Sequence, residues 1–449
     1  MYTQGSVKCI LSALGNVHWV DISASQEDTW PNRTSRACYA VMREHLSTFR
    51  GVVLNGPRQA GKSTLLDAIH RQLGGTLLNL DNEQLLQAAT ADPVSFASSG
   101  TKPRFIDEVQ RGGDPLLRAI KAEVDAKPTP GRYVLAGSTR FLTTPSLSES
   151  LAGRVAVVDV WPFSPGELEG RSDRFIDIIF ADPSSLAGLE TSAVDRLDYF
   201  TRVCRGGFPE PALMRTARAR RAWFRSYVQA ISERDIREMA RVNEPSAIAS
   251  LLSYLASITA QEHNSANTSN KTGLHRGTVN RYLELLEAVF LIHRLPAWSR
   301  NMTARVVKHP KLHLTDTGLA APLLGISPES LALPVTPARE PLIETFIVNE
   351  LAKQSTWSDT AVRLHHWRVS GGAEVDVVIE RDDGQVVGVE AKAKDTVTAE
   401  DFRGLAALRD LLGPQFTRGV VLHTGRQGSI TFGDRLVSLP ISSLWEARC

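Results

Sequence analysis

The feature that most constrains this chain of 449 residues is a short segment, GPRQAGKS, which begins at Gly56 and ends at Ser63. It matches the pattern G-x-x-x-x-G-K-[ST], and it lies between the apolar run GVVLN and the helix-like run STLLDAIHRQL. Glycines allow such a loop to direct its backbone N–H groups at phosphate oxygens, and the following helix adds a partial positive charge. The segment predicts a phosphate-binding loop. A chance glycine-rich turn is the alternative, and the flanking strand and helix argue against it.

The residues of this loop predict the nucleotide contacts. The expected contacts come from Gly56, Pro57, Arg58, Gln59, Ala60, Gly61, Lys62, Ser63 and Thr64. Lys62 is expected to reach the β- and γ-phosphates, and Ser63 is expected to ligate Mg²⁺. ATP and Mg²⁺ are therefore the expected cofactors.

Two acidic residues and a serine follow at the ends of later predicted strands. RFIDE ends with Asp107, expected to hold Mg²⁺ through water, and Glu108, expected to orient or deprotonate the attacking water. YVLAG is followed by Ser138, which would lie between the acids and sense the γ-phosphate. A simple turn at the strand end is the alternative for Ser138.

A candidate catalytic arginine, Arg154, lies further along in SESLAGR. An arginine close to a γ-phosphate stabilises the charge of the transition state. A salt bridge that holds a helix is an equally good interpretation. The sequence leaves open whether Arg154 would act in its own subunit or on a neighbour.

The pattern of apolar segments predicts an α/β multidomain protein. Residues 1–35 are polar and turn-rich, which indicates an irregular leader. Over residues 36–200, apolar strands alternate with helices, as in a parallel sheet covered on both faces. After about residue 200 the strands disappear for more than a hundred residues, so 201–335 is expected to be helical. A helix and alternating strands over 336–449 predict a further α/β domain.

Several segments together resemble a known family. The resemblance is carried by GPRQAGKST, FIDEVQR, LAGSTRFL, SESLAGR, RGGFPEPAL, SERDI, KLHLTDTGL, LIETFIVNEL, EVDVVIE and VEAKA, which cover about residues 45–395. They are similar to bacterial and archaeal AAA-type P-loop ATPases whose C-terminal domain of unknown function is restriction-endonuclease-like. The resemblance implies ATP binding and hydrolysis, a winged-helix-like middle and a nuclease-like end. It supplies no settled biological role.

The middle of the chain is basic, although the whole chain has 51 Lys and Arg against 49 Asp and Glu. Residues 201–311 contain 18 basic and 8 acidic side chains, a net charge of +10. One arginine cluster comprises Arg215, Arg218, Arg220, Arg221 and Arg225. Arg218, Arg221 and Arg225 share one helical face, which suits contacts with a phosphate backbone. A solvated face, or a surface that meets the ATPase domain, is the alternative.

The segment SANTSNKTGLHRGTVNRYLELLEAVFLIHRL predicts a helix, a turn at Gly273, a second helix and a strand. This is the order of a winged helix. Arg276, Thr278, Asn280 and Arg281 lie near the start of the second helix, where they would reach base edges or phosphates. The alternative is a module that only packs between domains.

An acidic constellation follows in residues 374–401, which contain 9 acidic and 3 basic side chains. Asp376 lies in one predicted strand, and Glu390 and Lys392 share a face of the next. Two carboxylates can hold a divalent cation, and a lysine can position water. The pattern resembles the core of restriction-endonuclease-like nucleases, and the match implies a site of Glu344, Asp376, Glu390 and Lys392. A cross-strand salt bridge between Lys392 and Asp376 is the alternative.

Three functions remain open from the sequence. The chain is expected to be an ATPase that couples nucleotide state to contacts with DNA, RNA or a protein. The alternatives are an ATP-regulated, Mg²⁺-dependent nuclease and a nucleotide-switched interaction module without cleavage. Four scattered cysteines fit a reducing cytosol, and no apolar stretch is long enough to span a membrane, so a cytoplasmic location is expected. Assembly into oligomers is left open.

Overall fold

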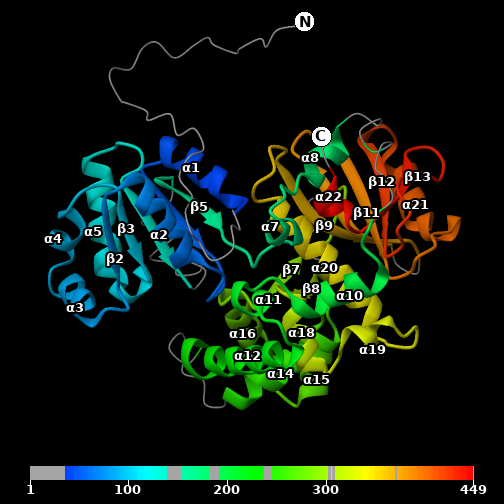
Figure 1. Ribbon diagram of the computed structural model, residues 1–449, viewed down its shortest axis with the longest axis horizontal. Helices are drawn as coiled ribbons and strands as arrows, with labels where there is room; N and C mark the ends of the chain where they lie inside the picture. The colour runs from blue at the N-terminus through cyan, green and yellow to red at the C-terminus, as the bar shows by residue number, and fades with distance from the viewer. Residues whose placement is uncertain are drawn as a thin grey trace, which may run out of the picture. The chain divides into compact units, whose positions relative to one another are not determined.

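The computed structural model describes residues 36–447 apart from 139–150, 152, 182–185, 187–191, 237–244, 302–304, 306–308 and 370–371. The predicted leader, residues 1–35, lies outside the described residues. Three sheets organise the part that is described (Figure 1).

The first sheet is parallel and follows the phosphate-binding segment. Its strands, in the order β2-β3-β4-β1-β5, are Thr76–Asn79, Arg104–Asp107, Tyr133–Gly137, Gly51–Asn55 and Val155–Asp159. β1 pairs with β4 on one side and with β5 on the other, so Gly51 lies opposite both Tyr133 and Val155. The strand before the acids begins at Arg104, and the alternation of strands and helices predicted for this region is confirmed.

Helices cover both faces of this sheet because alternate strand residues point to opposite sides. Val52 and Leu54 of β1 belong to one hydrophobic cluster, whereas Val53 belongs to another. The first cluster includes α1 (Cys38–Thr48) and α2 (Lys62–Leu73), and the second includes α5 (Gly113–Ala126). The remaining helices here are α3 (Glu83–Ala91), α4 (Pro93–Ser98) and a 3-10 turn, Val109–Gly112.

The middle of the chain is mainly helical. Its helices are α7 (Pro165–Glu169), α8 (Phe175–Phe180), α10 (Arg196–Arg205), α11 (Pro209–Leu213), α12 (Ala217–Ala230), α14 (Pro245–Ser257), α15 (Ser265–Thr272), α16 (Arg276–Ala288), α18 (Thr317–Leu324) and α19 (Pro328–Ala332). A π-helical turn, Ile231–Asp235, continues α12. Gly273 ends α15 in the left-handed conformation, as a residue without a side chain can.

The middle also contains a small antiparallel sheet with the strand order β6-β8-β7. Its strands are Gln261–Glu262 (β6), Lys311–Leu314 (β8) and Ile292–Leu295 (β7). The prediction that strands disappear for more than a hundred residues is therefore wrong. β6 and β8 have two and four residues, too few to give a visible alternation, whereas β7 lies in the segment predicted as a strand.

The C-terminal domain begins with α20 (Arg339–Gln354) and contains a six-stranded mixed sheet. In the order β13-β14-β12-β11-β10-β9, its strands are Ile430–Thr431, Leu436–Pro440, Phe416–His423, Val386–Lys392, Glu374–Arg381 and Val362–Arg368. β11 pairs in parallel with β12 and antiparallel with β10. A 3-10 turn (Ala399–Phe402), α21 (Arg403–Leu412), a second 3-10 turn (Gly413–Gln415) and α22 (Ser443–Glu446) complete the domain.

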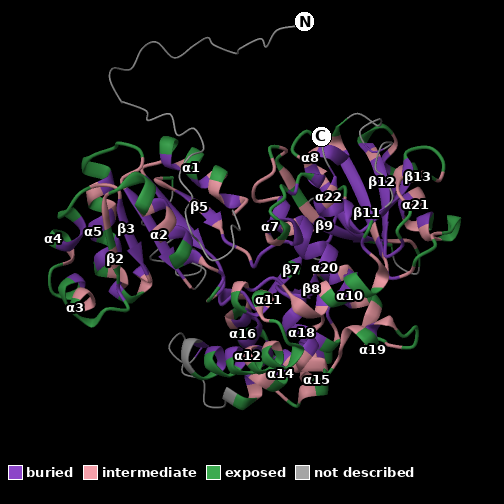
Figure 2. Ribbon diagram, viewed as in Figure 1, coloured by how far each residue is buried: buried purple, intermediate pink, exposed green. Residues whose placement is uncertain are grey.

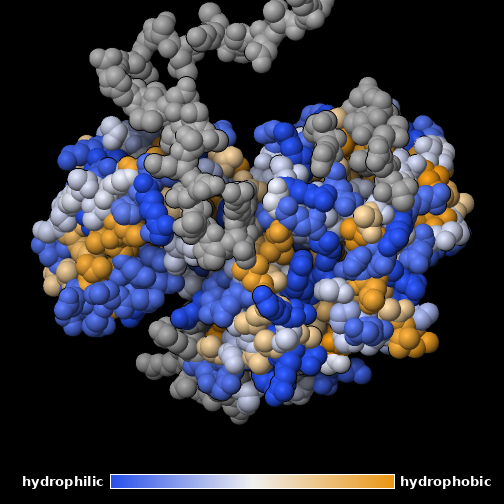
Figure 3. Space-filling model, in the orientation of Figure 1, coloured by the Kyte–Doolittle hydropathy of each residue, from blue (hydrophilic) through white to orange (hydrophobic). Residues whose placement is uncertain are grey.

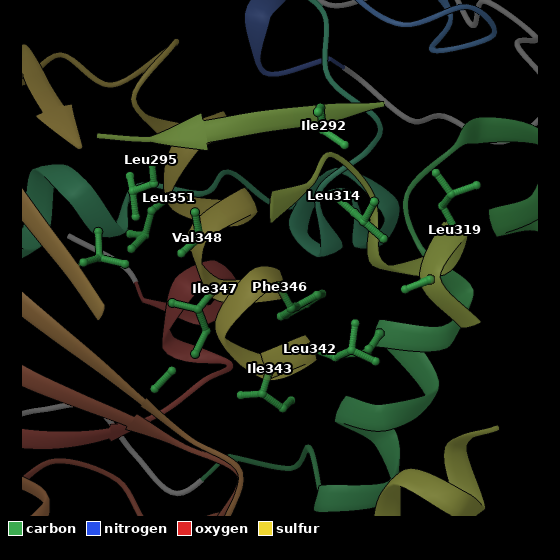
Figure 4. Close-up of a cluster of buried hydrophobic side chains, with 14 of the residues drawn as sticks. Ile292, Leu295, Leu314, Leu319, Leu342, Ile343, Phe346, Ile347, Val348 and Leu351 are labelled. Carbon is green, nitrogen blue, oxygen red and sulfur yellow. The ribbon is translucent and has the colours of Figure 1, made fainter. Parts of the chain in front are cut away.

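Helix α20 packs against both the C-terminal sheet and the middle of the chain. One hydrophobic cluster joins residues from Phe175 to Ala447 and includes Ile347 of α20 and Val389 of β11. Figure 4 shows α20 side chains directed at β7 and at Leu314 and Leu319. This cluster begins at Phe175, earlier than the expected boundary at residue 200. It also continues across the expected boundary between 335 and 336.

The surface carries few large hydrophobic side chains in the described residues. Those exposed are scattered: Leu73, Leu77, Val94, Leu197, Leu213, Leu333, Val335, Val369 and Leu411. The burial colours of Figure 2 and the small hydrophobic patches on the face drawn in Figure 3 agree with this distribution. No helix among the described residues has both the length and the apolar character needed to cross a membrane.

We expect Ile347→Ala to lower the free energy of unfolding by about 2–5 kcal/mol, because it leaves a cavity where α20 meets two parts of the chain. Urea unfolding followed by circular dichroism measures the change. Leu411→Ala, at a side chain that is 42% exposed on α21, is the control and should have little effect. Equal losses in the two variants would contradict this account of α20.

Candidate functional site

The phosphate-binding loop has the backbone that its glycines require. Gly56 has a φ of 155°, and a Cβ at this position would lie 2.2 Å from the carbonyl oxygen of Val160. Gly61 has a φ of 94° and precedes the first turn of α2. Both positions therefore exclude larger residues, for steric reasons at Gly56 and for conformational reasons at Gly61.

Lys62 lies buried beneath this loop. Its ammonium donates hydrogen bonds to the carbonyl oxygens of Gly56 at 2.8 Å and Pro57 at 2.7 Å. Burial lowers the pKa of Lys62 to about 8, although the carboxylates of Glu108 and Asp107 act in the opposite direction. The two hydrogen bonds hold the ammonium inside the loop that would surround a phosphate.

The other loop residues differ in exposure. Ser63 and Thr64 are exposed in the first turn of α2, and Gln59 is exposed with a φ of 60°. Arg58 is half-buried, whereas Pro57 and Ala60 are buried. Exposed hydroxyls at the helix N-terminus are available to a ligand from solvent.

The structure brings the predicted acids and Ser138 to the same edge of the sheet. β4 lies between β1 and β3, so Ser138, after β4, lies between the loop and the end of β3. The Ser138 hydroxyl donates to Oε2 of Glu108 at 3.2 Å. Gln110 donates to the same oxygen, and its amide nitrogen lies 3.4 Å from the Ser138 hydroxyl. Asp107 is 3% exposed and accepts a hydrogen bond from the Glu108 amide at 3.0 Å.

Arg154, predicted to be catalytic either in its own subunit or on a neighbour, does not lie at this site of its own chain. It precedes β5, and its neighbour Val155 pairs with Gly51, at the opposite end of β1 from the loop. The ends of a five-residue strand are about 13 Å apart. Arg154 instead forms a two-pronged ion pair with Asp125 of α5, at 2.5 and 3.0 Å. The alternative interpretation, a salt bridge that holds a helix, is the one that the structure supports.

Sequence reasoning missed another arginine, Arg36, that contacts the loop. Its guanidinium donates to the carbonyl oxygen of Ala60 and, at 2.9 Å, to that of Trp161. It also lies 4.0 Å from the ring centre of Phe163 and 3.5 Å from Oε2 of Glu167. No local motif marks Arg36, because its partners lie 24 to 131 positions away.

The four residues implied as a nuclease site lie in one cluster in the C-terminal domain. Glu344 and Asp376 both face the ammonium of Lys311, and burial together with the charge of Asp376 raises the pKa of both Glu344 and Glu390. Burial is the larger cause, and it raises the pKa of Glu390 to about 8. Lys392 pairs with Oε1 of Glu390 at 2.7 Å rather than with Asp376, whose Oδ2 accepts the amide of Ala391 at 2.9 Å. The alternative of a Lys392–Asp376 salt bridge is therefore not observed.

A fifth residue, Lys311 of β8, occupies this cluster and was not predicted. Its ammonium lies 2.7 Å from Glu344, 2.8 Å from Glu374 and 3.3 Å from Asp376. Among the described residues, no group of three or more His, Cys, Asp or Glu side chains is arranged to hold a metal ion. The carboxylates therefore do not fit a divalent cation in this arrangement, because an ammonium lies among them.

The basic residues predicted on helices fall on the surface. Arg218, Arg221 and Arg225 are exposed on α12, as is Arg215 before it, whereas Arg220 donates to the carbonyl oxygen of Met214 at 2.7 Å. On α16, the exposed residues are Arg276, Asn280 and Arg281, and Thr278 is half-buried.

Comparison with protein families divides the chain into three matches. An AAA domain matches residues 48–169, a domain of unknown function (DUF8612) matches 196–330, and a second domain of unknown function (DUF4143) matches 339–444. The parallel sheet with its phosphate-binding loop is therefore an AAA-type P-loop domain. The C-terminal match names no activity, and it does not extend to the restriction-endonuclease-like fold that the resemblance implied.

Related proteins extend over most of the chain. Uncharacterized proteins of Mycobacterium bovis and Mycobacterium tuberculosis are 29% identical over 412 residues, which is 91% of this chain and 84% of theirs. A further uncharacterized protein, from Haemophilus influenzae, is 25% identical over 295 residues, covering 61% of this chain and 69% of its own.

Similar solved structures include two ATP-associated proteins. The Walker-type ATPase of Pyrococcus abyssi has a TM-score of 0.39 at 16% identity and covers 64% of this chain and 94% of its own. AMPPCP-bound DnaA of Aquifex aeolicus has a TM-score of 0.27 at 14% identity. The match covers 57% of this chain and 88% of the DnaA chain. The assignment of the P-loop domain rests on its strand order and loop, together with the family match.

We expect Arg36→Ala to weaken ATP binding about tenfold, because a charged hydrogen bond to the loop carbonyl is lost. Titration with a fluorescent ATP analogue measures the affinity. Arg50→Ala is the matched control, since Arg50 pairs with Asp125 at 3.2 Å, near the opposite end of β1. Unchanged affinity in Arg36→Ala, or an equal loss in Arg50→Ala, would show that Arg36 does not support the loop.

Proposed function

We propose that this protein is an ATPase that couples its nucleotide state to contacts of its helical middle with nucleic acid or with a protein. The observation that carries the proposal is the meeting of three groups at one sheet edge. These are the buried ammonium of Lys62, the acidic pair after β3 and the Ser138 hydroxyl. They have the chemistry needed to bind a triphosphate and to direct water at it.

Each residue has a role in this proposal. Lys62 would exchange its loop carbonyls for phosphate oxygens, which are stronger acceptors for an ammonium. Ser63 and Asp107 are the residues that would hold Mg²⁺, which neutralises phosphate charge when it is bound. Glu108 would take the proton of the attacking water. The hydrogen bonds from Ser138 and Gln110 both go to its Oε2, so Oε1 is the oxygen for that proton.

Coupling to the middle of the chain is supported by a direct contact. The Tyr227 hydroxyl of α12 donates to the carbonyl oxygen of Arg58 in the loop at 3.1 Å. The same helix carries the exposed Arg218, Arg221 and Arg225. A change of the loop on phosphate binding would thus act on the helix that bears the basic surface.

A winged-helix fold for the middle is supported by the order of its elements. The chain runs α14, β6, α15, α16, β7 and β8, and the sheet order is β6-β8-β7. The connection from β7 to β8, where a wing would lie, contacts the C-terminal domain, since Trp298 donates its amide to the His366 carbonyl oxygen at 2.6 Å. Nucleic acid would therefore meet α12 and α16 rather than this connection.

The nuclease alternative has less support. Its four expected residues are close together, but the ammonium of Lys311 lies among the carboxylates. An interaction module without hydrolysis would have no need for Glu108 and its hydrogen bonds with Ser138 and Gln110.

We expect Lys62→Ala to abolish ATP binding and Glu108→Gln to keep binding but lower the hydrolysis rate about 100-fold or more. The first change removes the phosphate-binding charge, and the second removes the proton acceptor while the side chain keeps its size. Phosphate release and analogue titration measure the two properties. Glu123→Gln is the control. Glu123 lies on α5, away from the loop, and its carboxylate pairs with Arg132 at 3.2 Å. Full hydrolysis by Glu108→Gln would contradict the assigned role.

We expect the triple change of Arg218, Arg221 and Arg225 to Ser to weaken binding of double-stranded DNA. The slope of log affinity against log salt should fall by about 0.9 for each phosphate contact that is lost. Fluorescence anisotropy at several salt concentrations measures this slope. The control is the same change at three exposed arginines of the C-terminal domain, Arg363, Arg403 and Arg426. Equal slopes in the two triple variants would favour a protein partner.

A further inference from the structure

One lysine of the middle domain ends among the carboxylates of the C-terminal domain. Lys311 belongs to β8, and its side chain is 3% exposed. Its ammonium pairs with Glu344 of α20 at 2.7 Å and with Glu374 and Asp376 of β10 at 2.8 and 3.3 Å. A single ammonium therefore meets three carboxylates from two elements.

The chemistry of this group suits the position. An ammonium is a compact charge with three N–H donors, so it can satisfy one oxygen from each of three carboxylates. Burial alone would lower the pKa of Lys311, but Asp376, Glu344 and Glu374 together raise it. Lys311 is thus charged, and it offsets the repulsion among the three neighbouring carboxylates, of which Glu344 and Asp376 are the more buried.

The remaining groups of the cluster have partners of their own, apart from one carboxylate oxygen. Glu390 pairs with Lys392 through Oε1, and its buried Oε2 has no hydrogen-bond partner within the described structure. Asp376 uses its other oxygen for the Ala391 amide. Oε1 of Glu344 and Oδ1 of Asp376 face the ammonium of Lys311, so the charge between these two carboxylates is already supplied by the chain itself.

We propose that Lys311 is the resident cation of this acidic cluster, in the place that a divalent metal would take, and that it joins the middle and C-terminal domains. The cluster in this state is then an internal ammonium site and does not bind Mg²⁺ for cleavage. The inference does not depend on the proposed ATPase, because none of its residues lies at the P-loop.

The test replaces Lys311 in the full-length protein and supplies a metal in its place. Lys311→Met should lower the Tm by roughly 5 °C or more, since three carboxylates lose their counter-charge and two of them, Glu344 and Asp376, are largely shielded from water. Mn²⁺ at millimolar concentration, without nucleotide, should restore most of this loss, because binding to the native state stabilises it. Wild type should show no such shift. The electron paramagnetic resonance signal of free Mn²⁺ should show one additional bound ion in the variant, absent when Asp376→Asn is added.

Two further variants keep the test decisive. Lys102→Met is the matched control, because Lys102 is half-buried but its ammonium binds a carbonyl oxygen and the Tyr133 hydroxyl instead of carboxylates. It should gain no Mn²⁺ site. Lys311→Gln, which retains a polar group, replaces Lys311→Met if that variant does not fold. The proposal is overturned if wild type binds Mn²⁺ in an Asp376-dependent manner, or if neither Lys311 variant gains a site.

Discussion

Helix α20 sets the strongest constraint on this structure, because it is buried between the C-terminal sheet and the middle of the chain. A buried helix must find partners for each polar side chain, since an unpaired polar group costs more inside the protein than in water. Thr345 meets Thr259 at 2.9 Å and His313 at 3.1 Å, and Asn349 meets His293 at 2.7 Å. The polar groups of α20 thus fix which middle-domain strands lie against it. The ion pair between Glu344 of α20 and Lys311 of β8 is a further polar contact of this kind.

The same helix reaches the segment that follows the P-loop sheet. The Lys353 ammonium pairs with Glu350 at 2.6 Å and donates to the carbonyl oxygen of Phe163 at 3.0 Å. Phe163 in turn lies against the guanidinium of Arg36, which contacts the P-loop. Arg36, Phe163 and Lys353 therefore connect the loop with α20 through one cation–π contact and one hydrogen bond.

The P-loop core was predictable because its signals are local. The loop, its strand and its helix are contiguous, whereas the strand order that brings Asp107 and Ser138 to the loop was seen only in the structure. Arg36 and Lys311 could not be predicted, because each acquires its role from partners far away in the sequence. For Arg154 the sequence could not choose between a catalytic role and a salt bridge, for a related reason. The sequence places it close to the motifs, but it precedes β5, at the wrong end of that strand.

The charge of the middle domain takes a different meaning in the structure. The net +10 suggested a surface for polyanions, yet some of these charges are used internally. Lys311 is buried among three carboxylates, and Arg305 forms a two-pronged pair with Glu380 at 2.6 and 2.8 Å. Both partners belong to the acidic C-terminal domain, so part of the charge contrast between the domains serves to hold them together. Among the described residues, α12 and α16 carry five exposed arginines, Arg218, Arg221, Arg225, Arg276 and Arg281, and these belong to the charge that remains for a partner.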